Sequence, residues 1–460
     1  MKLLFQSGIL VLDDVSSPLP AAAMPLLRYD RRLNAWCARA CDYRALVTLL
    51  HRQHIPFIDQ AGNYRKLEQL KLAEELIPRP HQQEALIAWR NSGNRGIVAL
   101  PTGSGKTILA VMAIAEVKRQ TLVLVPTLDL LSQWVEVLER FFKIEIGMIG
   151  GGSHQVTDLT VCTYDSAVLQ QEFIGDKFGL LIADECHHLS GKEYQLAASM
   201  CIAPFRLGLS ATPELPDDKQ HILYDQLGQV VCEKHIDELS GNVLSPYRVC
   251  CLKTALTAEE KSLYHASRQI YTDFLRRNNI DFNAPNAWKK FMYLAGRTES
   301  GRQAFAAFLT QRDIARSSRS KLDLLWRLLQ RHAGERILIF TADNRTAYEI
   351  GRRFVLPVLT HHTGVKERKE FLQCFRDGTY PVLATSQVLN EGVDVPEASV
   401  GIVISGSGSV REHVQRLGRI LRRAPDKPQA VLYEIVSGET GEESTGWRRR
   451  NHRAYRKWRS

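Results

Sequence analysis

The stretch Gly96–Val117, GIVALPTGSGKTILAVMAIAEV, decides how the surrounding chain folds. It begins with a small, apolar segment typical of a buried strand and ends with an apolar helical pattern from Ile108 onward. The loop between them, Pro101–Thr107, carries two glycines. A strand, a glycine-rich loop and a helix in this order bring backbone N–H groups and a helix N-terminus together around phosphate groups. The stretch therefore predicts an α/β domain with a phosphate-binding loop.

The residues of this loop have separate roles in such a site. Glycines let the backbone approach the phosphates, Lys106 reaches the β- and γ-phosphates, and the Thr107 hydroxyl is a ligand for Mg²⁺. The full pattern has glycine five residues before Gly105, where this chain has Leu100. The residues expected to bind the nucleotide are Thr102, Gly103, Ser104, Gly105, Lys106 and Thr107.

A second buried strand, Leu180–Ala183, ends in the acidic pair Asp184 and Glu185. Ligands of α/β sheets bind at the carboxyl ends of the strands, so we expect this pair beside the phosphate loop. Asp184 would hold Mg²⁺ through water, and Glu185 would orient and deprotonate the water that attacks the γ-phosphate. The pair therefore predicts hydrolysis of ATP.

A third candidate segment, Gln415–Arg422, lies near the C-terminus. Arg419 and Arg422 are three residues apart and share one face if the segment is helical. Two guanidinium groups that face the transferred phosphate would stabilise the charge that develops in the transition state. Both arginines are therefore candidate catalytic residues.

Strands rich in Val, Ile and Leu alternate with helical patterns in two series, within 96–209 and 336–435. This alternation predicts two α/β domains, each with a parallel sheet covered on both faces. The stretch between them has few strand signals and predicts a helical insertion. The expected domains are an N-terminal domain (1–75), a first α/β domain (76–255), the insertion (256–320), a second α/β domain (321–437) and a basic tail (438–460).

Composition and charge limit the class of protein. The 460 residues are 44% hydrophobic and 24% charged, which excludes a largely disordered, fibrous or multi-span membrane chain. Residues 447–460 carry six Arg, one Lys and no acid, and so supply +7 of the formal net charge of +10. This run suits a phosphate backbone or an anionic surface, although a solvated tail is the alternative.

The nine cysteines are odd in number and scattered, which favours a reducing compartment over a disulfide framework. We find no export signal and expect no membrane association, so the expected location is the cytoplasm, near the nucleoid. Cys37, Cys41, His51 and His54 offer four metal ligands, but their spacing favours a packed helix with buried thiols.

Taken in order, the motifs resemble those of the superfamily 2 helicases over residues 79–422. The segment from Arg79 to Gln82 is similar to the motif that reads adenine, which adds these two residues to the nucleotide site. The other matches are motif I (101–107), Ia (Pro126, Thr127), Ib (Thr163), II of the DECH type (184–187), III (210–212), IV (Phe340, Thr341), V (385–394) and VI (415–422).

The resemblance implies roles that the residues alone do not show. Pro126, Thr127, Thr163 and Thr385 would contact the nucleic-acid backbone. Gly392 and Asp394 would contact the nucleotide, and Ser210 and Thr212 would couple hydrolysis to movement. His187 and Gln415 would contact each other across the cleft. The implied fold is two RecA-like domains with a thumb-like helical insertion.

Within the superfamily, the chain is most similar to the short archaeal and bacterial members of the XPB branch. The supporting features are Leu100, the segment FRLGLSATP (205–213), the helical insertion and a stretch (26–59) similar to the damage-recognition region of that branch. The branch has Arg-Glu-Asp after motif III, where this chain has Leu-Pro-Asp (215–217). The resemblance therefore supports translocation more directly than strand separation.

The implied activity is ATP-dependent movement on or unwinding of DNA, from 3′ to 5′, during repair. The implied cofactors and partners are ATP, Mg²⁺, DNA and a nuclease or other repair protein. Two alternatives stay open within this chemistry, an RNA remodeller and the motor of a defence system. A third, of another class, is a nucleic-acid-binding scaffold that uses ATP as a conformational ligand with little turnover.

The insertion also carries cationic and aromatic residues that allow two interpretations. Lys289, Lys290, Arg297 and Arg302 accompany Trp288, Phe291 and Tyr293. These side chains either grip duplex DNA and stack on a displaced base, or form a core-facing aromatic stripe with solvated charges.

Overall fold

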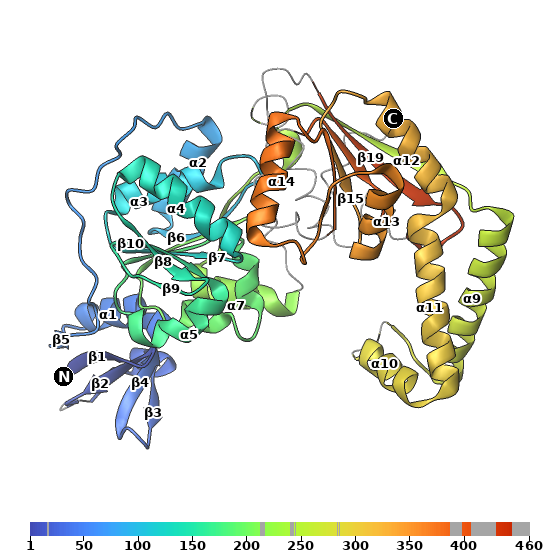
Figure 1. Ribbon diagram of the computed structural model, residues 1–460. Coiled ribbons are helices and arrows are strands. Elements are labelled where there is room, and N and C mark those ends of the chain that lie inside the picture. The colour runs from blue at the N-terminus through green and yellow to red at the C-terminus, as the bar shows by residue number, and fades with distance from the viewer. Residues whose placement is uncertain are drawn as a thin grey trace. The chain divides into compact units, whose positions relative to one another are not determined.

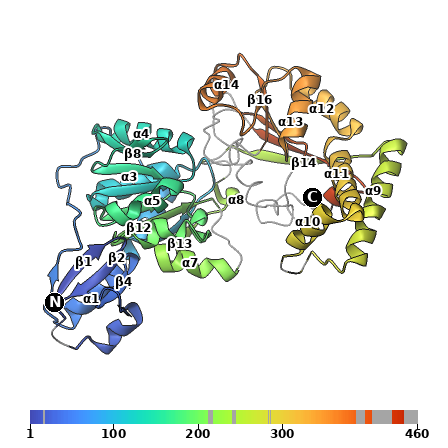
Figure 2. The same cartoon turned by 60° about the horizontal axis from the view of Figure 1, so that its bottom comes forward.

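The computed structural model describes residues 1–15, 18–211, 217–239, 243, 245–282, 284, 286–386, 398–405 and 429–443. The described chain forms two units (Figures 1 and 2), of which the first comprises Met1–Glu238 and the second begins at Leu239. The short helix α8 (Ile236–Leu239) lies at this boundary.

The first unit begins with a small five-stranded sheet in the order β3-β4-β2-β1-β5. Its elements are β1 (Lys2–Gln6), β2 (Ile9–Asp13), β3 (Arg28–Asp30), β4 (Ala35–Arg39), α1 (Tyr43–Arg52) and β5 (Ile58–Asp59). Leu10 and Leu12 of the sheet pack with Leu46 and Leu50 of α1 in a core of their own. This N-terminal domain is therefore a folded module rather than an extension of the larger sheet.

The larger sheet of the first unit has eight strands in the order β13-β6-β12-β11-β7-β10-β8-β9. All neighbouring strands are parallel except β8 and β9. The strands are β6 (Arg95–Ala99), β7 (Thr121–Val125), β8 (Ile146–Gly150), β9 (Ser153–His154), β10 (Leu159–Thr163), β11 (Leu180–Ala183), β12 (Phe205–Ser210) and β13 (Val230–Glu233).

Helices cover both faces of this sheet because alternate strand residues point to opposite sides. Val123 and Val125 of β7 pack in one cluster, while Leu122 and Leu124 pack in the other. The first cluster includes α2 (Pro80–Asn91), α3 (Lys106–Val117) and α4 (Leu128–Phe142), and the second includes α5 (Tyr164–Ile174), α6 (Gln195–Ser199) and α7 (Asp217–Leu227). Figure 2 shows α3, α4, α5 and α7 around the sheet.

The N-terminal domain docks at the amino ends of these parallel strands. Arg44 donates to the carbonyl oxygens of Gly93 and Pro204, just before β6 and β12. Arg65 bonds Asp158, just before β10, at 2.7 Å. The domain thus occupies the edge of the sheet opposite the one where ligands of α/β folds bind.

Arg206 is a fully buried charge at this amino edge. Its guanidinium donates to four carbonyl oxygens, those of Ala198, Cys201, Ala203 and Gln226. These acceptors replace the water that the cation loses on burial, and they join the end of α7 to the loop before β12.

The second unit contains a six-stranded parallel sheet in the order β14-β19-β18-β15-β17-β16. Its strands are β14 (Tyr247–Thr254), β15 (Ile337–Phe340), β16 (Val358–Leu359), β17 (Val382–Thr385), β18 (Val400–Val403) and β19 (Ala430–Ser437). Its helices α12 (Arg319–Arg331), α13 (Asn344–Phe354) and α14 (Val365–Asp377) follow the insertion.

The expected end of the first α/β domain, at residue 255, differs from the structure. The strand β14 pairs along its whole length with β19 of the second sheet. We expected these residues in the first domain because they follow its other strands in the sequence. In the structure, β13 is the edge strand of the first sheet, and β14 forms its backbone hydrogen bonds with β19 of the second sheet. The boundary therefore lies near residue 239.

The stretch expected to be a helical insertion contains α9 (Ala258–Arg277), α10 (Ala287–Arg297) and α11 (Glu299–Ser317). A capping box starts α9, in which Thr257 Oγ1 accepts from Glu260 N at 3.2 Å and Glu260 Oε2 accepts from Thr257 N at 2.9 Å. The long helices α9 and α11 pack against each other, and α10 packs on α11.

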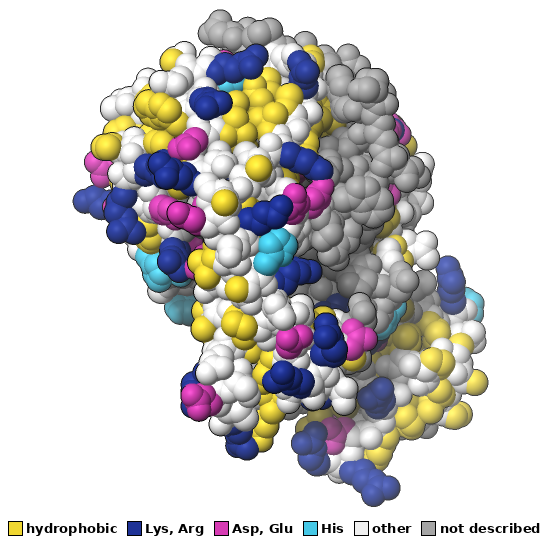
Figure 3. Space-filling model, turned by 90° about the vertical axis from the view of Figure 1, so that its right-hand side faces the viewer, with side chains coloured by type: hydrophobic (Ala, Val, Ile, Leu, Met, Phe, Trp, Pro, Cys, Tyr) yellow, Lys and Arg dark blue, Asp and Glu magenta, His cyan; other side chains and the backbone are white. Residues whose placement is uncertain are grey.

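The aromatic residues of this insertion divide between the two interpretations. Phe291 is fully buried with Phe274 in a separate small core. Trp288 and Tyr293 stay 47% and 56% exposed, and Arg297 stacks over the Tyr293 ring at 4.3 Å. Figure 3, which views the structure from the side of the second unit, shows Lys and Arg side chains spread among uncovered apolar ones. Phe291 therefore belongs to the core of the insertion, whereas Trp288 and Tyr293 lie at its surface.

Neither a membrane span nor a metal cluster occurs among the described residues. No helix in this part of the chain is long and apolar enough to cross a membrane. No group of three or more His, Cys, Asp or Glu within it could hold a metal ion, and Cys37 and Cys41 are buried thiols.

The role of Arg206 gives a stability prediction. Arg206→Met keeps the apolar stem but removes a donor from four carbonyl oxygens, of which those of Ala198 and Gln226 keep a second donor. We therefore expect the first unit to lose about 2–4 kcal/mol of stability. Urea unfolding followed by circular dichroism measures this loss. The matched control is Arg52→Met at an exposed position on α1, which should change stability by less than about 0.5 kcal/mol. Equal unfolding midpoints for the two variants would contradict the assignment.

Candidate nucleotide site

The phosphate loop joins the carboxyl end of β6 to the first residue of α3, Lys106. Gly103 and Gly105 have φ angles of +84° and +89°, in the left-handed region that glycine adopts readily. A Cβ atom at Gly105 would lie 2.4 Å from Gln82 Nε2. The backbone conformation therefore favours glycine at 105, and a side chain there would displace the Gln82 amide.

The first turn of α2 holds the loop in place. Gln82 Nε2 donates to the carbonyl oxygen of Gly105 at 3.1 Å, and His81 Nε2 lies 2.9 Å from that of Ser104. Gln82 Oε1 also accepts from Arg79 N at 2.9 Å. Ser104 is fully buried and its hydroxyl donates to Pro101 O, so this side chain braces the loop from inside. Sequence reasoning missed His81, although it lies inside the Arg79–Gln82 motif.

Polar groups of the loop remain available to a ligand. Lys106 Nζ donates to Leu100 O at 3.1 Å, which keeps the ammonium group over the loop. Thr102 Oγ1 is buried and forms no hydrogen bond within the described residues. Thr107 is half-buried in the first turn of α3, where backbone N–H groups have no partner inside the helix. These donors suit the oxygens of a triphosphate.

The acidic pair follows β11, where Asp184 is 6% exposed. Its Oδ2 accepts from Trp134 Nε1 at 2.9 Å and its Oδ1 accepts from Glu185 N at 3.0 Å. Burial, together with the neighbouring charge of Glu185, raises the pKa of Asp184 to about 6, against the opposing effects of Lys106 and Trp134. Trp134, on α4, is a further site residue that no sequence motif indicated.

Glu185 has an unusual backbone conformation, with φ at +46°. Residues other than glycine enter this region only at a cost, which often accompanies a functional position. Glu185 is 9% exposed, and its Oε2 forms no hydrogen bond within the described residues. His187 Nδ1 lies 3.6 Å from this oxygen. One carboxylate oxygen therefore accepts no hydrogen bond from the described residues and can accept one from a ligand.

Strand order brings these parts together. In the larger sheet of the first unit, β12 lies between β6 and β11, with Ser210 opposite Ala99 and Gly208 opposite Ala183. The phosphate loop, Ser210 and the acidic pair therefore follow three adjacent strands at one edge. Ser210 is buried, and its carbonyl oxygen accepts from Leu100 N at 2.9 Å.

Two candidate nucleic-acid contacts lie farther along the same edge. Thr127 and Thr163 follow β7 and β10 and cap the N-termini of α4 and α5, with Oγ1 accepting from Leu130 N and Ser166 N at 3.3 Å. Pro126 lies between β7 and this cap. In the second unit, Thr385 ends β17, is buried, and donates to Ser386 O. Their contacts with a strand stay predictions.

Several expected site residues lie outside the described residues, so their placement stays a prediction. They are Thr212 of motif III, Gly392 and Asp394 of motif V, Gln415, Arg419 and Arg422 of motif VI, and the basic run 447–460.

Three protein-family models match the chain. The model for the damage recognition domain of the xeroderma pigmentosum group B helicase matches residues 3–61. The model for the res subunit of type III restriction enzymes matches residues 75–215, and that for the helicase conserved C-terminal domain matches residues 320–424. Among solved structures, the helicase domain of Pyrococcus furiosus Hef covers 82% of this chain and is covered over 99% of its own, with a TM-score of 0.52 at 19% identity, which shows a shared fold.

Curated relatives extend the match over nearly the whole chain. The DNA 3′-5′ translocase XPB2 of Sulfurisphaera tokodaii is 40% identical over 94% of this chain and 97% of its own. The DNA 3′-5′ helicase XPB of Kineococcus radiotolerans is 29% identical over 79% of this chain and 60% of its own. A more distant match, 25% identical over 79% of this chain and 42% of the relative, is the factor IIH helicase/translocase subunit XPB/SSL2 of Saccharomyces cerevisiae. The chain belongs to the XPB family of superfamily 2 helicases.

Proposed function

We propose that this chain is an ATP-driven motor that moves on DNA from 3′ to 5′. The main support is that a glycine-rich phosphate loop, Ser210 and an acidic pair lie at the ends of three adjacent strands. Two capped helix N-termini lie farther along the same edge of the sheet. The names of the archaeal and bacterial relatives support the polarity and the choice of DNA. Membership of the family supports a role in repair, which implies a location beside the nucleoid and a nuclease or other repair protein as partner.

The described residues fit ATP with Mg²⁺. The loop N–H groups and Lys106 bind phosphate oxygens. The resemblance supports a role in reading the adenine ring for Arg79 and Gln82, at the start of α2. Thr107 and Asp184 would hold Mg²⁺, which when bound neutralises phosphate charge. Glu185 orients the attacking water and accepts its proton at the oxygen that no described residue binds. Arg419 and Arg422 are proposed to stabilise the transition state.

Movement requires that nucleotide state change the grip on the strand. Thr127 and Thr163 stand at helix N-termini, where backbone N–H groups attract phosphates. Ser210 ends β12, between the nucleotide loop and the acidic pair, and the resemblance supports a role for it and for Thr212 in coupling hydrolysis to movement. Phosphate contacts of this kind read no base sequence and weaken with salt.

The choice of nucleic acid is tested by steady-state ATP hydrolysis without activator, and then with single-stranded DNA, duplex DNA, forked DNA or RNA at low and moderate salt. We expect strong stimulation by DNA, since strand contacts favour the hydrolytic state. Greater stimulation by RNA would identify an RNA remodeller. Indifference to every nucleic acid would favour a scaffold that binds ATP as a conformational ligand.

Substitutions separate nucleotide binding from hydrolysis. Lys106→Ala removes a phosphate ligand and should abolish both, whereas Glu185→Gln should keep ATP binding but lower kcat by roughly 10²–10⁴-fold, because it removes only the base. Nucleotide binding by fluorescence titration and kcat by phosphate release distinguish the two. The matched control is Glu193→Gln, the same change at an exposed position, which should leave both quantities unchanged. A Glu185→Gln enzyme with normal kcat would refute the base assignment.

The raised pKa of Asp184 predicts a pH dependence. Only the carboxylate form ligates a cation, so at low Mg²⁺ activity should be lost as pH falls through about 6. Because Mg²⁺ competes with the proton, higher Mg²⁺ should shift this acid limb to lower pH. Profiles of kcat/KM against pH at two Mg²⁺ concentrations check this. An acid limb that stays fixed as Mg²⁺ rises would exclude Asp184 as the titrating ligand.

A further inference from the structure

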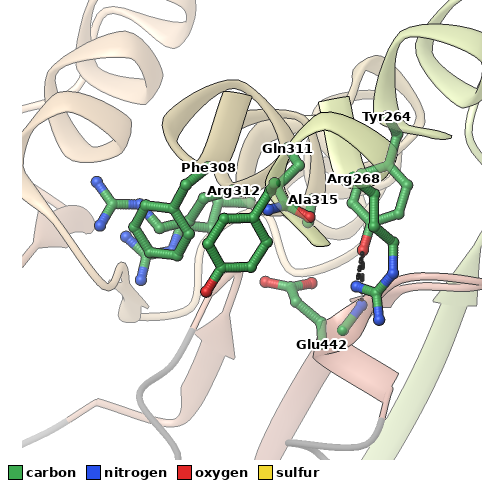
Figure 4. Close-up of a pocket in the computed structure, with 10 residues that line it drawn as sticks. Tyr264, Arg268, Phe308, Gln311, Arg312, Ala315 and Glu442 are labelled. Carbon is green, nitrogen blue, oxygen red and sulfur yellow. Dashed lines mark hydrogen bonds between the residues drawn. The ribbon is translucent and has the colours of Figure 1, made fainter. Parts of the chain in front are cut away.

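A pocket of about 310 Å³ lies at the base of the α9–α11 hairpin, wholly within the second unit (Figure 4). Tyr264, Arg268 and Tyr271 line it from α9 at i, i+4 and i+7, and Phe308 and Arg312 line it from α11 at i and i+4. Residues at these spacings share one helix face, so two helices present their facing sides to the same space. The turn after β19 closes the base with Glu442.

Two of the cations at this pocket have carboxylate partners. Arg316 on α11 bonds Asp343 at 2.7 Å, and the buried Lys321 bonds Glu442. Four further carboxylates on α9, α11 and the turn after β19 are also paired: Asp273 with Arg276, Asp313 with Arg345, Glu439 with Lys261 and Glu443 with Lys253. They are therefore not available to neutralise further charge in the pocket.

Arg268 and Arg312 lack such a partner. Arg268 donates to the neutral Tyr264 hydroxyl at 3.3 Å, and Figure 4 shows these two side chains together at one end of the pocket. Arg312 stacks over Phe308 at 5.5 Å, and its buried Nε forms no hydrogen bond with any described residue. Within the described chain, no carboxylate oxygen lies within 4.0 Å of a nitrogen of either guanidinium group. The pocket therefore keeps two uncompensated positive charges, one of them partly buried.

The chemistry of the lining selects a class of ligand. A partly desolvated guanidinium without an anion is costly, and an anionic ligand recovers that free energy. The planar fork of Arg matches phosphate, and aromatic rings offer faces to a nucleobase. The volume is at the lower end of the range for small-molecule pockets, which suits a single nucleotide.

We propose that this pocket binds one nucleotide, with its phosphate either at Arg312, at the end beside Phe308, or at Arg268, at the other end (Figure 4), and its base against Tyr264, Tyr271 and Phe308. This site is separate from the phosphate loop, which belongs to the first unit. The nucleotide is either one unit of the DNA strand or a free nucleoside phosphate. That the nucleotide comes from a DNA strand rests on the proposed function, whereas the affinity of the pocket for a nucleotide does not.

The test compares Arg268→Gln and Arg312→Gln with Arg327→Gln, an equal loss of charge at an exposed position on α12. Fluorescence anisotropy with labelled oligo(dT) measures strand binding at several salt concentrations, and calorimetry with dTMP measures free nucleotide while ADP and Mg²⁺ fill the phosphate loop. Equal thermal midpoints show that the variants fold. Arg312→Lys, which keeps the charge, should retain most of the binding.

For a strand, each Gln variant at the pocket should weaken binding by about tenfold and reduce the salt slope by about 0.7 for each phosphate that is no longer neutralised. For a free nucleotide, dTMP should bind the wild type and Arg327→Gln but not Arg312→Gln. If wild-type protein binds dTMP but no DNA, the proposed function fails and the pocket stands. If the wild type binds DNA or dTMP and the pocket variants match Arg327→Gln in both assays, the inference is overturned.

Discussion

The parallel pairing of β6, β12 and β11 is the constraint on which the site depends. Each strand is buried on both faces, so its register with its neighbours is fixed by packing as well as by hydrogen bonds. Because the three strands run in one direction, the loop after β6, Ser210 and the acidic pair must leave the sheet at the same edge. The strand order thus brings Lys106 and Asp184 to one site although they are 78 positions apart in the sequence.

The carboxyl and amino ends of the strands in this sheet differ in how completely their polar groups are hydrogen-bonded. The carboxyl edge carries strained backbone at Glu185, left-handed glycines and polar atoms without described partners. The amino edge carries the fully satisfied Arg206 and the docked N-terminal domain. Stability is thus concentrated where no ligand is expected, and the carboxyl edge keeps groups that a ligand must satisfy, as is common at functional sites.

The residues expected to act on the nucleotide are easier to predict from the sequence than the residues that hold them in place. The phosphate loop and the acidic pair are local patterns, and their chemistry follows from residue type and from the strands that precede them. His81 and Trp134 bind the loop and Asp184 from other helices, and no local pattern indicates a contact between residues 50 positions apart, such as Trp134 with Asp184. The assignment of β14 failed for the same reason, since its partner β19 lies far along the chain. The uncompensated arginines of the α9–α11 pocket also needed the fold, because a sequence shows charges but not their partners.

Within the second unit, the hairpin of α9 and α11 follows β14 of the sheet and is followed by α12, which packs in the core of that sheet, so both of its ends are attached to the same α/β domain. Its longest helix has 20 residues and is therefore about 30 Å long at 1.5 Å per residue. A long hairpin that is attached only at its base moves farther at its tip than at its base when it tilts. A tilt of about 10° at the base would carry the tip through roughly 5 Å, about one turn of helix. A small change in the angle at which the hairpin joins the sheet would therefore be amplified at its tip.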